Sequence, residues 1–319
     1  MLNNSMTALE FFARYSSEEA CLEAIEKMRW PKGFVCPNCQ HDVGYRLTDR
    51  NLFQCAVCRH QTSVTAGTIF HKTRVPLTNW FYILYSVAHD KGGSSAARLS
   101  QQLNMHYSTV WHIVQKIKYA MAKRDENILL AGEIELDTMF VGPEARKMGR
   151  PSARRDDDCL GKSHPKPVRQ FRFGKLQTPV IVMVETLSGR AGNVAMRVVE
   201  RTTYDDIQEF AMQRAEPGQH FKTDGDHSNY SLRTVGFHTA KVCSGRKSLE
   251  WLPIVHRVIS LAKRHLMGTY HGVSPMYLQS YLDDFCFRFN RREKILSLAT
   301  SALRACVFAN QISYAELWR

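Results

Sequence analysis

Apolar residues recur at helical spacing in the first part of the chain, outside a cysteine-containing stretch that shows only short β-like runs. Residues 8–30 place apolar side chains three to four positions apart, and Pro31 ends that pattern. Residues 76–90 predict one helix, and residues 94–124 predict a helix, a short turn and a second helix. We expect Ser108 to be the N-cap of that second helix, because its hydroxyl can accept a backbone N–H of the first turn.

From residue 131 onward the pattern changes to short apolar runs bounded by turn residues. Such runs are typical of strands, and helical spacing returns between and after them. Strands with interspersed helices indicate a mixed α/β (α+β) domain. The predicted strands are residues 132–142, 178–189, 193–200 and a run within 218–226, and the predicted helices are residues 203–215, 251–267 and 275–292.

The composition of the chain predicts the kind of partner that it binds and the compartment in which it works. A chain of 319 residues is long enough for two or three domains. Its net charge of +13 at pH 7 indicates a polyanionic partner, and nucleic acid fits better than a membrane because no basic amphipathic anchor is evident. The sequence has neither a membrane-length apolar run nor a signal-peptide pattern, so we expect a soluble, cytoplasmic protein.

Four of the nine cysteines form two C-x-x-C pairs. Cys36 and Cys39 are separated by fifteen residues from Cys55 and Cys58, which is the spacing of a structural zinc site. Two tight turns with two thiolates each can complete a tetrahedron around one cation and organise a segment that is too poor in apolar residues to fold alone. We therefore predict a structural Zn²⁺ whose ligands all come from the protein.

The helical segment that follows the cysteines is a candidate helix-turn-helix. Its second helix begins with polar and aromatic residues that suit entry into a DNA major groove. Any pair of antiparallel helices has a similar sequence pattern, so a plain helical hairpin is the alternative. The candidate DNA contacts are Ser108, Thr109, Trp111 and His112.

A basic stretch interrupts the second half of the chain. Residues 144–177 contain ten Lys and Arg against four acids, with Gly and Pro throughout. One interpretation is a solvated insertion, and the other is a basic arm that neutralises DNA phosphates. In the second case the DNA contacts include Arg154, Arg155, Arg169 and Arg172.

Two aspartates are the candidate catalytic groups. Asp137 lies within an apolar strand, where an acid is costly to bury unless it binds something, although an exposed edge strand would also accommodate it. Asp224 ends a second strand, and the following glycine allows the backbone to turn away. Carboxylates at the ends of adjacent strands form an oxygen-lined site for Mg²⁺ or Mn²⁺, which suits phosphodiester transfer.

A third ligand is expected on a downstream helix. Residues 251–272 contain no acid that could be this ligand. His256 occupies the expected position instead, and Lys263 follows it seven residues later. Because an offset of seven returns to nearly the same helical face, both can point into one cleft. His256 can bind Mn²⁺ or orient water, and Lys263 can hold a phosphate.

The order of these motifs resembles a known family. From about residue 10 to 295, the CPNC and CAVC pairs, EIELDTMFVG, FKTDGD, VHRVISLAKRHL and FRFNRR are similar to bacterial insertion-sequence transposases. These proteins have an N-terminal zinc ribbon and an ISXO2-like, DDE-type catalytic domain with an RNase H-like fold. The resemblance implies DNA cleavage and strand transfer with a divalent metal.

The resemblance also implies roles for individual residues. It maps the first two catalytic acids onto Asp137 and Asp224, and the third position, followed by a lysine, onto His256 and Lys263. Glu250 and Asp284 remain alternative acids for the third position. The basic residues of the FRFNRR motif are expected near DNA, namely Arg288, Arg291 and Arg292.

The resulting prediction is a transposase that binds the terminal inverted repeats of its element and target DNA as a homodimer or higher oligomer. A zinc-ribbon and helix-turn-helix regulator without catalysis, and an RNase H-like nuclease without strand transfer, are the alternatives. The expected domains are an N-terminal helical segment 1–33, a zinc ribbon 34–72, a helix-turn-helix-like segment 73–125, a catalytic domain 131–295 with the basic insertion 144–177, and a C-terminal tail 296–319.

Overall fold

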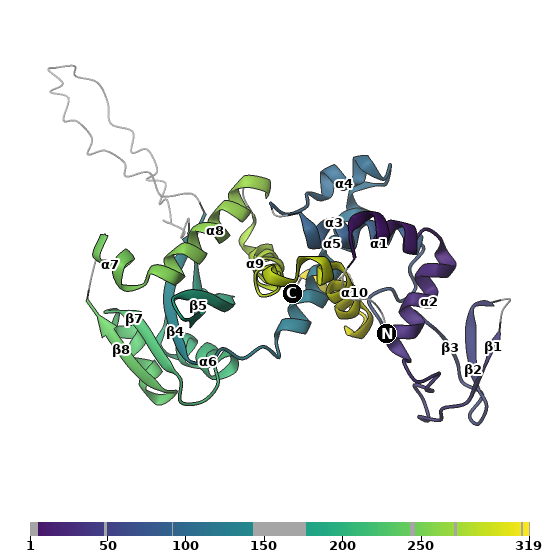
Figure 1. Ribbon diagram of the computed structural model, residues 1–319, viewed down its shortest axis with the longest axis horizontal. Coiled ribbons are helices and arrows are strands. Elements are labelled where there is room, and N and C mark those ends of the chain that lie inside the picture. The colour runs from purple at the N-terminus through teal and green to yellow at the C-terminus, as the bar shows by residue number, and fades with distance from the viewer. Residues whose placement is uncertain are drawn as a thin grey trace, which may run out of the picture.

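The computed structural model describes residues 6–47, 50–90, 92–142, 177–242, 246–270, 273–313 and 315–318. Figure 1 shows an elongated molecule with a small zinc-ribbon-like sheet at one end and a larger sheet at the other. Helices lie between the two sheets. None of the helices within the described ranges is both long and apolar enough to cross a membrane.

The N-terminal part combines helices with a three-stranded antiparallel sheet. Helices α1 (Ala8–Arg14) and α2 (Glu18–Arg29) come first. The sheet follows, with β1 (Gly44–Leu47), β2 (Leu52–Cys55) and β3 (Gln61–Ser63) in the order β1-β2-β3. Aromatic rings anchor this sheet to the helices, because Trp30 lies 5.0 Å from Phe34 and 5.2 Å from Phe53, measured between ring centroids.

Three further helices follow in the segment where the sequence predicts a helix-turn-helix. They are α3 (Leu77–His89), α4 (Ala96–Gln102) and α5 (Tyr107–Asp125). The expected N-cap at Ser108 is wrong. The N-cap lies two residues earlier, at His106, whose Nδ1 accepts the backbone N–H of Ser108 at 3.4 Å. An imidazole nitrogen thus takes the place of the hydroxyl that the sequence suggested.

The larger sheet has five strands in the order β6-β5-β4-β7-β8. β5 runs antiparallel to both of its neighbours, whereas β4, β7 and β8 are parallel. This is the strand order of the RNase H-like fold, so the expected fold class is confirmed. The strands are β4 (Glu133–Val141), β5 (Thr178–Leu187), β6 (Arg190–Val198), β7 (His220–Asp224) and β8 (Phe237–Lys241).

Helices cover both faces of this sheet. One face packs on α6 (Tyr204–Arg214) and on the 3-10 helix η2 (His227–Thr234). The other face packs on α8 (Pro253–Tyr270) and α9 (Pro275–Phe289), with the short α7 (Arg246–Trp251) just before α8. Along β4 the side chains alternate, so Met139 lies in the core under α8 and Leu136 in the core under α6.

The C-terminal residues return to the N-terminal part. After η3 (Arg292–Ser297), helix α10 (Leu298–Phe308) packs against α2, α3 and α5, and η4 (Glu316–Trp318) follows. Leu303 and Cys306 are fully buried in the same core as α3 and α5. Residues that the sequence suggested to be a tail therefore include a core helix, and Figure 1 shows α10 beside α5 and α2.

Candidate metal centres and active site

The four paired cysteines converge at one point of the zinc-ribbon-like sheet. Their sulfur atoms all lie within 4.8 Å of one another, with Cys36 Sγ 3.6 Å from Cys58 Sγ and Cys39 Sγ 3.5 Å from Cys55 Sγ. A disulfide would need about 2 Å. Tetrahedral Zn–S bonds of about 2.3 Å place sulfurs about 3.8 Å apart, so the spacing fits one zinc ion.

The two cysteine turns share one local geometry. The residue after the second cysteine of each pair has a left-handed backbone, with φ of 63° at Gln40 and 59° at Arg59. The second cysteine of each pair also accepts a backbone N–H. Cys39 accepts that of His41, and Cys58 accepts that of His60. This repeated turn aims both thiolates of a pair at the same point, which is what a closed structural site requires.

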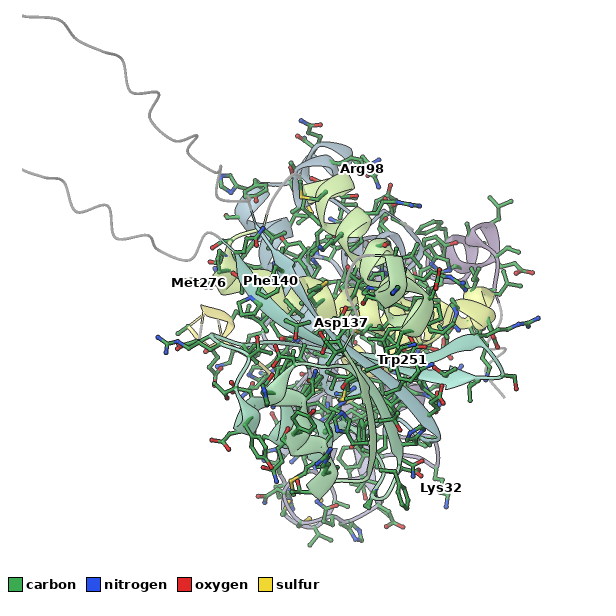
Figure 2. All side chains as sticks on the ribbon, turned by 90° about the vertical axis from the view of Figure 1, so that its left-hand side faces the viewer. Lys32, Arg98, Asp137, Phe140, Trp251 and Met276 are labelled. Atoms are coloured by element: carbon green, nitrogen blue, oxygen red, sulfur yellow. The ribbon has the colours of Figure 1, made fainter. Side chains whose placement is uncertain are left out.

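The two candidate catalytic aspartates lie on neighbouring parallel strands. Glu135 of β4 pairs with Lys222 of β7, and Asp137 and Asp224 each lie two residues further along. The register therefore brings them to adjacent positions on the same sheet face, the one that α8 covers. Figure 2 shows Asp137 on the end of the molecule that carries the larger sheet.

The candidate third ligand meets Asp137 directly. His256 lies in the first turn of α8, and its Nδ1 is 3.4 Å from Asp137 Oδ2. The other ring nitrogen lies 3.1 Å from Ser248 Oγ, on α7. Lys263, seven residues further along α8, is close enough to lower the pKa of Asp137. The structure thus brings together all four candidate catalytic residues.

The charge of Asp137 is only partly compensated by the groups around it. Burial raises its pKa, and the charge of Asp224 adds to that effect. The backbone N–H of Thr138 at 2.8 Å, His256 and Lys263 act in the opposite direction without cancelling it. A buried carboxylate with a raised pKa beside a second carboxylate is the arrangement that a bound cation would stabilise.

Asp224 is held in place by its own loop. Its Oδ1 accepts the amide of Asn229 at 2.7 Å and the backbone N–H of Asp226 at 3.2 Å. Gly225 is needed there, because an added Cβ would lie 2.4 Å from Val242 Cγ2. The second oxygen of Asp224 makes no hydrogen bond recorded within the described ranges, so one side of the carboxylate is available to a ligand.

Glu135 positions α8, a role that the sequence analysis missed. Its buried Oε2 accepts the backbone N–H groups of Ile254 at 2.9 Å and Val255 at 2.8 Å. Burial raises its pKa, and these two N–H groups oppose that shift. Because Glu135 shares a strand face with Asp137, it fixes the start of α8 and thereby places His256. The available signal was a second acid two residues before Asp137 in the same apolar strand.

The two alternative acids lie elsewhere. Glu250 is exposed on α7, and within the described residues no hydrogen bond or ion pair joins it to Asp137, Asp224 or His256. Asp284 is fully buried on α9, where Arg288 Nε lies 2.9 Å and His265 Nε2 lies 3.6 Å from its carboxylate. Neither acid therefore adds to the Asp137 and Asp224 cluster in this structure.

The acidic cluster is more open than the cysteine site. Within the described parts of the chain, the four cysteines are the one group of three or more metal-ligand side chains whose ligand atoms all lie within 4.8 Å. Asp137, Asp224 and His256 are more widely spaced. Mg²⁺ sites commonly keep several waters and substrate oxygens as ligands, and such a spacing suits them.

The candidate helix-turn-helix contacts divide into two groups. Ser108 is exposed at the start of α5, and Thr109 and His112 are half-buried. Trp111 instead packs edge-on against Tyr277 of α9, with ring centroids 5.2 Å apart. One side of α5 is thus occupied by the larger domain.

The three arginines of the FRFNRR motif contact protein groups. Arg288 bonds to Asp284 and donates to Asp90 O at 2.7 Å, and Arg291 Nη2 lies 2.7 Å from Asp125 Oδ1. Arg292 donates to the backbone carbonyls of Gly192 and Phe289. In this structure they join α9 to α5 and β6.

The basic segment 144–177 lies outside the described residues except at its last position. The same holds for four of the candidate DNA contacts, Arg154, Arg155, Arg169 and Arg172. Their role stays a prediction from the sequence.

Comparison with known families identifies the class of protein. The ISXO2-like transposase domain matches residues 129–290, just over half of the chain, and the transposase zinc-ribbon domain matches residues 16–61. The chain therefore belongs to the ISXO2-like transposase family. This confirms the resemblance drawn from the sequence, and it makes the four cysteines the metal-binding group of a transposase zinc ribbon.

Two solved structures illustrate the structural similarity. The Mos1 mariner paired-end complex with Mn has 13% identity, covers 69% of this chain and 76% of its own, and gives a TM-score of 0.28. The pre-cleavage Mos1 transpososome has 13% identity, covers 72% and 78%, and gives a TM-score of 0.29. Both are weak overall likenesses. Among curated proteins, none matches this chain.

Proposed function

We propose that this chain is the transposase of an insertion sequence, which binds the terminal inverted repeats of its element and catalyses divalent-metal-dependent strand cleavage and transfer. The observation that carries the proposal is the placement of Asp137, Asp224 and His256 on the sheet face that α8 covers, beside the end of β7. Family membership gives the class of protein, and this cluster supplies the chemistry that such a protein needs.

Asp137, Asp224 and His256 are the proposed ligands of Mg²⁺ or Mn²⁺. The raised pKa of Asp137 supports this role, because a cation would relieve the repulsion between the two carboxylates. Two such ions, when bound, would activate water or a 3′-hydroxyl and stabilise the leaving oxygen. Lys263 would hold a phosphate oxygen near Asp137, and Glu135 keeps α8 in the position that this requires.

The N-terminal part is the proposed DNA-recognition unit. Zn²⁺ at Cys36, Cys39, Cys55 and Cys58 would hold the ribbon folded, and it would leave catalysis to the distant acidic cluster. On α5, the exposed and half-exposed residues Ser108, Thr109 and His112 are the proposed groove contacts. The basic segment 144–177 is proposed to neutralise phosphates. Chelation of zinc should weaken binding of the element's ends without changing the catalytic ligands.

The proposed assembly is a homodimer or higher oligomer on DNA, because two element ends must be held together for strand transfer. Closed symmetric dimers are the commonest such assemblies. The test is size measurement of the protein with and without DNA that carries one end. A complex with one protomer per two ends would contradict the proposal.

The activity is tested with duplexes that carry the element's ends, in Mg²⁺, Mn²⁺ or Ca²⁺. We expect nicking in Mg²⁺ or Mn²⁺ and its loss in Asp137→Asn and Asp224→Asn. Asp205→Asn is the matched control, because this acid is exposed on α6, across the sheet from the cluster. Full nicking by either core variant would overturn the site. Binding without nicking in the wild type would favour a regulator, and nicking without joining of a 3′ end would favour a nuclease.

A further inference from the structure

Two lysines converge on one indole ring beside Asp224. Lys222 Nζ lies 4.5 Å and Lys241 Nζ lies 5.3 Å from the centre of the Trp251 ring. The indole is fixed in place, because its Nε1 donates a hydrogen bond of 2.7 Å to Thr223 O. Figure 2 shows Trp251 and Asp137 on the same end of the molecule.

All three residues are tied to the strand end that carries Asp224. Lys222 lies two positions before Asp224 on β7 and shares its sheet face. Lys241 lies on β8, directly opposite Asp224 of β7 in the strand register. Trp251 bonds to the carbonyl of the residue just before Asp224. The two ammonium groups are therefore positioned by the same backbone that positions the acid.

Neither lysine is neutralised by a carboxylate. No ion pair within 4.0 Å is recorded for Lys222 or Lys241 across the described parts of the chain. Lys222 faces Glu135 across the strand pair and helps to lower its pKa, but from beyond ion-pair distance. Lysine on an edge strand can also serve to prevent strand pairing between molecules. That explanation suits Lys241, because β8 is an edge strand. It does not account for Lys222, because β7 is an inner strand.

We propose that Lys222, Lys241 and Trp251 form a phosphate-binding site for the DNA strand that enters the Asp137 and Asp224 cluster. The site takes a phosphodiester next to the one that reacts, and this inference rests on the proposed function. An ammonium over an indole uses the ring face for its attraction, so its N–H donors stay available to phosphate oxygens. The site anchors a polyanion beside two carboxylates that would otherwise repel it, and it fixes the register of the strand.

The test is the salt dependence of DNA binding, measured with a short nicked duplex in Ca²⁺, so that the strand stays intact. For the double variant Lys222→Gln and Lys241→Gln, we expect the slope of log K against log salt to become shallower by about 0.9, since the site neutralises one phosphate and each neutralised phosphate contributes about 0.9. The variant with arginine at both positions should restore the slope. An unchanged slope in the glutamine variant would overturn the proposal.

Arg233→Gln is the matched control. Arg233 is exposed and also lies over an aromatic ring, 4.6 Å from the centre of Tyr230, but it sits near the opposite end of β8. Its loss removes one charge and one cation–π contact without touching the Asp224 strand end. We expect its salt slope to equal that of the wild type. A change as large as that of the lysine double variant would indicate a general charge effect and overturn the site.

A second measurement locates the phosphate. Single neutral methylphosphonate linkages, placed one at a time along the nicked strand, should weaken wild-type binding most at one or two positions next to the nick. The lysine double variant should lose sensitivity at those positions alone. Equal loss at every position would overturn the proposal. Binding is measured without cleavage, so these outcomes are separable from failure of the proposed catalysis, which the Asp137→Asn nicking assay reports.

Discussion

Helix α8 carries two histidines, and each faces an aspartate from another element. His256 Nδ1 lies 3.4 Å from Asp137 Oδ2, and His265 Nε2 lies 3.6 Å from Asp284 Oδ2. The two histidines are nine residues apart, which is about two and a half turns, so they project from opposite sides of the helix. The same residue pair thus occurs in two surroundings.

The two surroundings differ in how completely neighbouring cations and hydrogen-bond donors compensate the charge of the aspartate. Asp284 is 1% exposed and is bonded by Arg288, and although burial raises its pKa, the charges of Arg288, Lys118 and His265 bring that pKa below the ordinary value. Asp137 is 19% exposed, has no guanidinium partner, and its pKa is raised. We infer that the saturated pair joins two parts of the protein, and that the open pair is the one able to take a metal and a substrate.

The largest expected contrast is in stability. Asp284→Asn leaves the guanidinium of Arg288 buried without a counter-charge, so it should lower the free energy of unfolding by about 3–5 kcal/mol. Asp137→Asn removes a carboxylate that repels Asp224, so it should leave stability unchanged or slightly raised. Urea unfolding of both variants beside Asp205→Asn measures the contrast. Equal losses for the two variants would contradict the distinction between a saturated and an open pair.

The next contrast is in catalysis. His256→Ala removes one proposed ligand, so nicking in Mn²⁺ should fall about a hundredfold, which corresponds to about 2.7 kcal/mol. Its urea unfolding curve should stay close to that of the wild type, because His256 is not part of the saturated pair. Glu250→Ala on α7 is the control and should nick normally. The reverse result, with Glu250→Ala inactive and His256→Ala active, would transfer the third role to Glu250.

The saturated pair should also give the protein a pH dependence. Burial lowers the pKa of His265 from 6.5 to about 4. The unfolded chain therefore takes up this proton at a higher pH than the folded protein does, so stability is complete above about pH 6.5 and falls as the pH drops towards 4. The loss between about pH 7 and pH 5 should be about 2 kcal/mol. Unfolding of His265→Gln at the two pH values should lack this component, whereas an unchanged difference would show that other groups cause it.

The sequence allowed the two acids and the zinc site to be predicted because each leaves a local signature. Asp137 interrupts an apolar strand, Asp224 precedes a glycine at a strand end, and the cysteines have a fixed spacing. The third position depended on the family resemblance, since a histidine on an amphipathic helix is common. The contact of His256 with Asp137 depends on how α8 packs on the sheet, which the sequence pattern does not give.

Features that depend on contacts between distant segments were not predictable. The sequence of α10 consists mostly of small and apolar residues, so it lacks the polar face that marks an ordinary surface helix, and its burial against α3 and α5 requires the folded structure. The packing of Trp111 on Tyr277 was also not predictable. Periodicity shows which face of α5 is apolar, but it does not show which other part of the chain packs on that face. The bond of Arg291 to Asp125 likewise joins segments far apart in the sequence, and its expected position near DNA stays a prediction.

The smallest expected effect tests how the open pair is positioned. In Glu135→Gln the amide oxygen can still accept the N–H groups of Ile254 and Val255, but the negative charge at the start of α8 is lost. Nicking should therefore fall about threefold to tenfold, with the Mn²⁺ dependence little changed.

Glu135→Leu has similar bulk but leaves both N–H groups without an acceptor, so its loss of nicking should exceed that of Glu135→Gln, and its apparent Mn²⁺ affinity should fall as His256 moves. Partial rescue by glutamine separates positioning from mere packing, because packing alone would treat the two variants alike. If Glu135→Leu bound Mn²⁺ as the wild type does, the placement of His256 would not depend on Glu135. The open pair would then be set by the sheet alone.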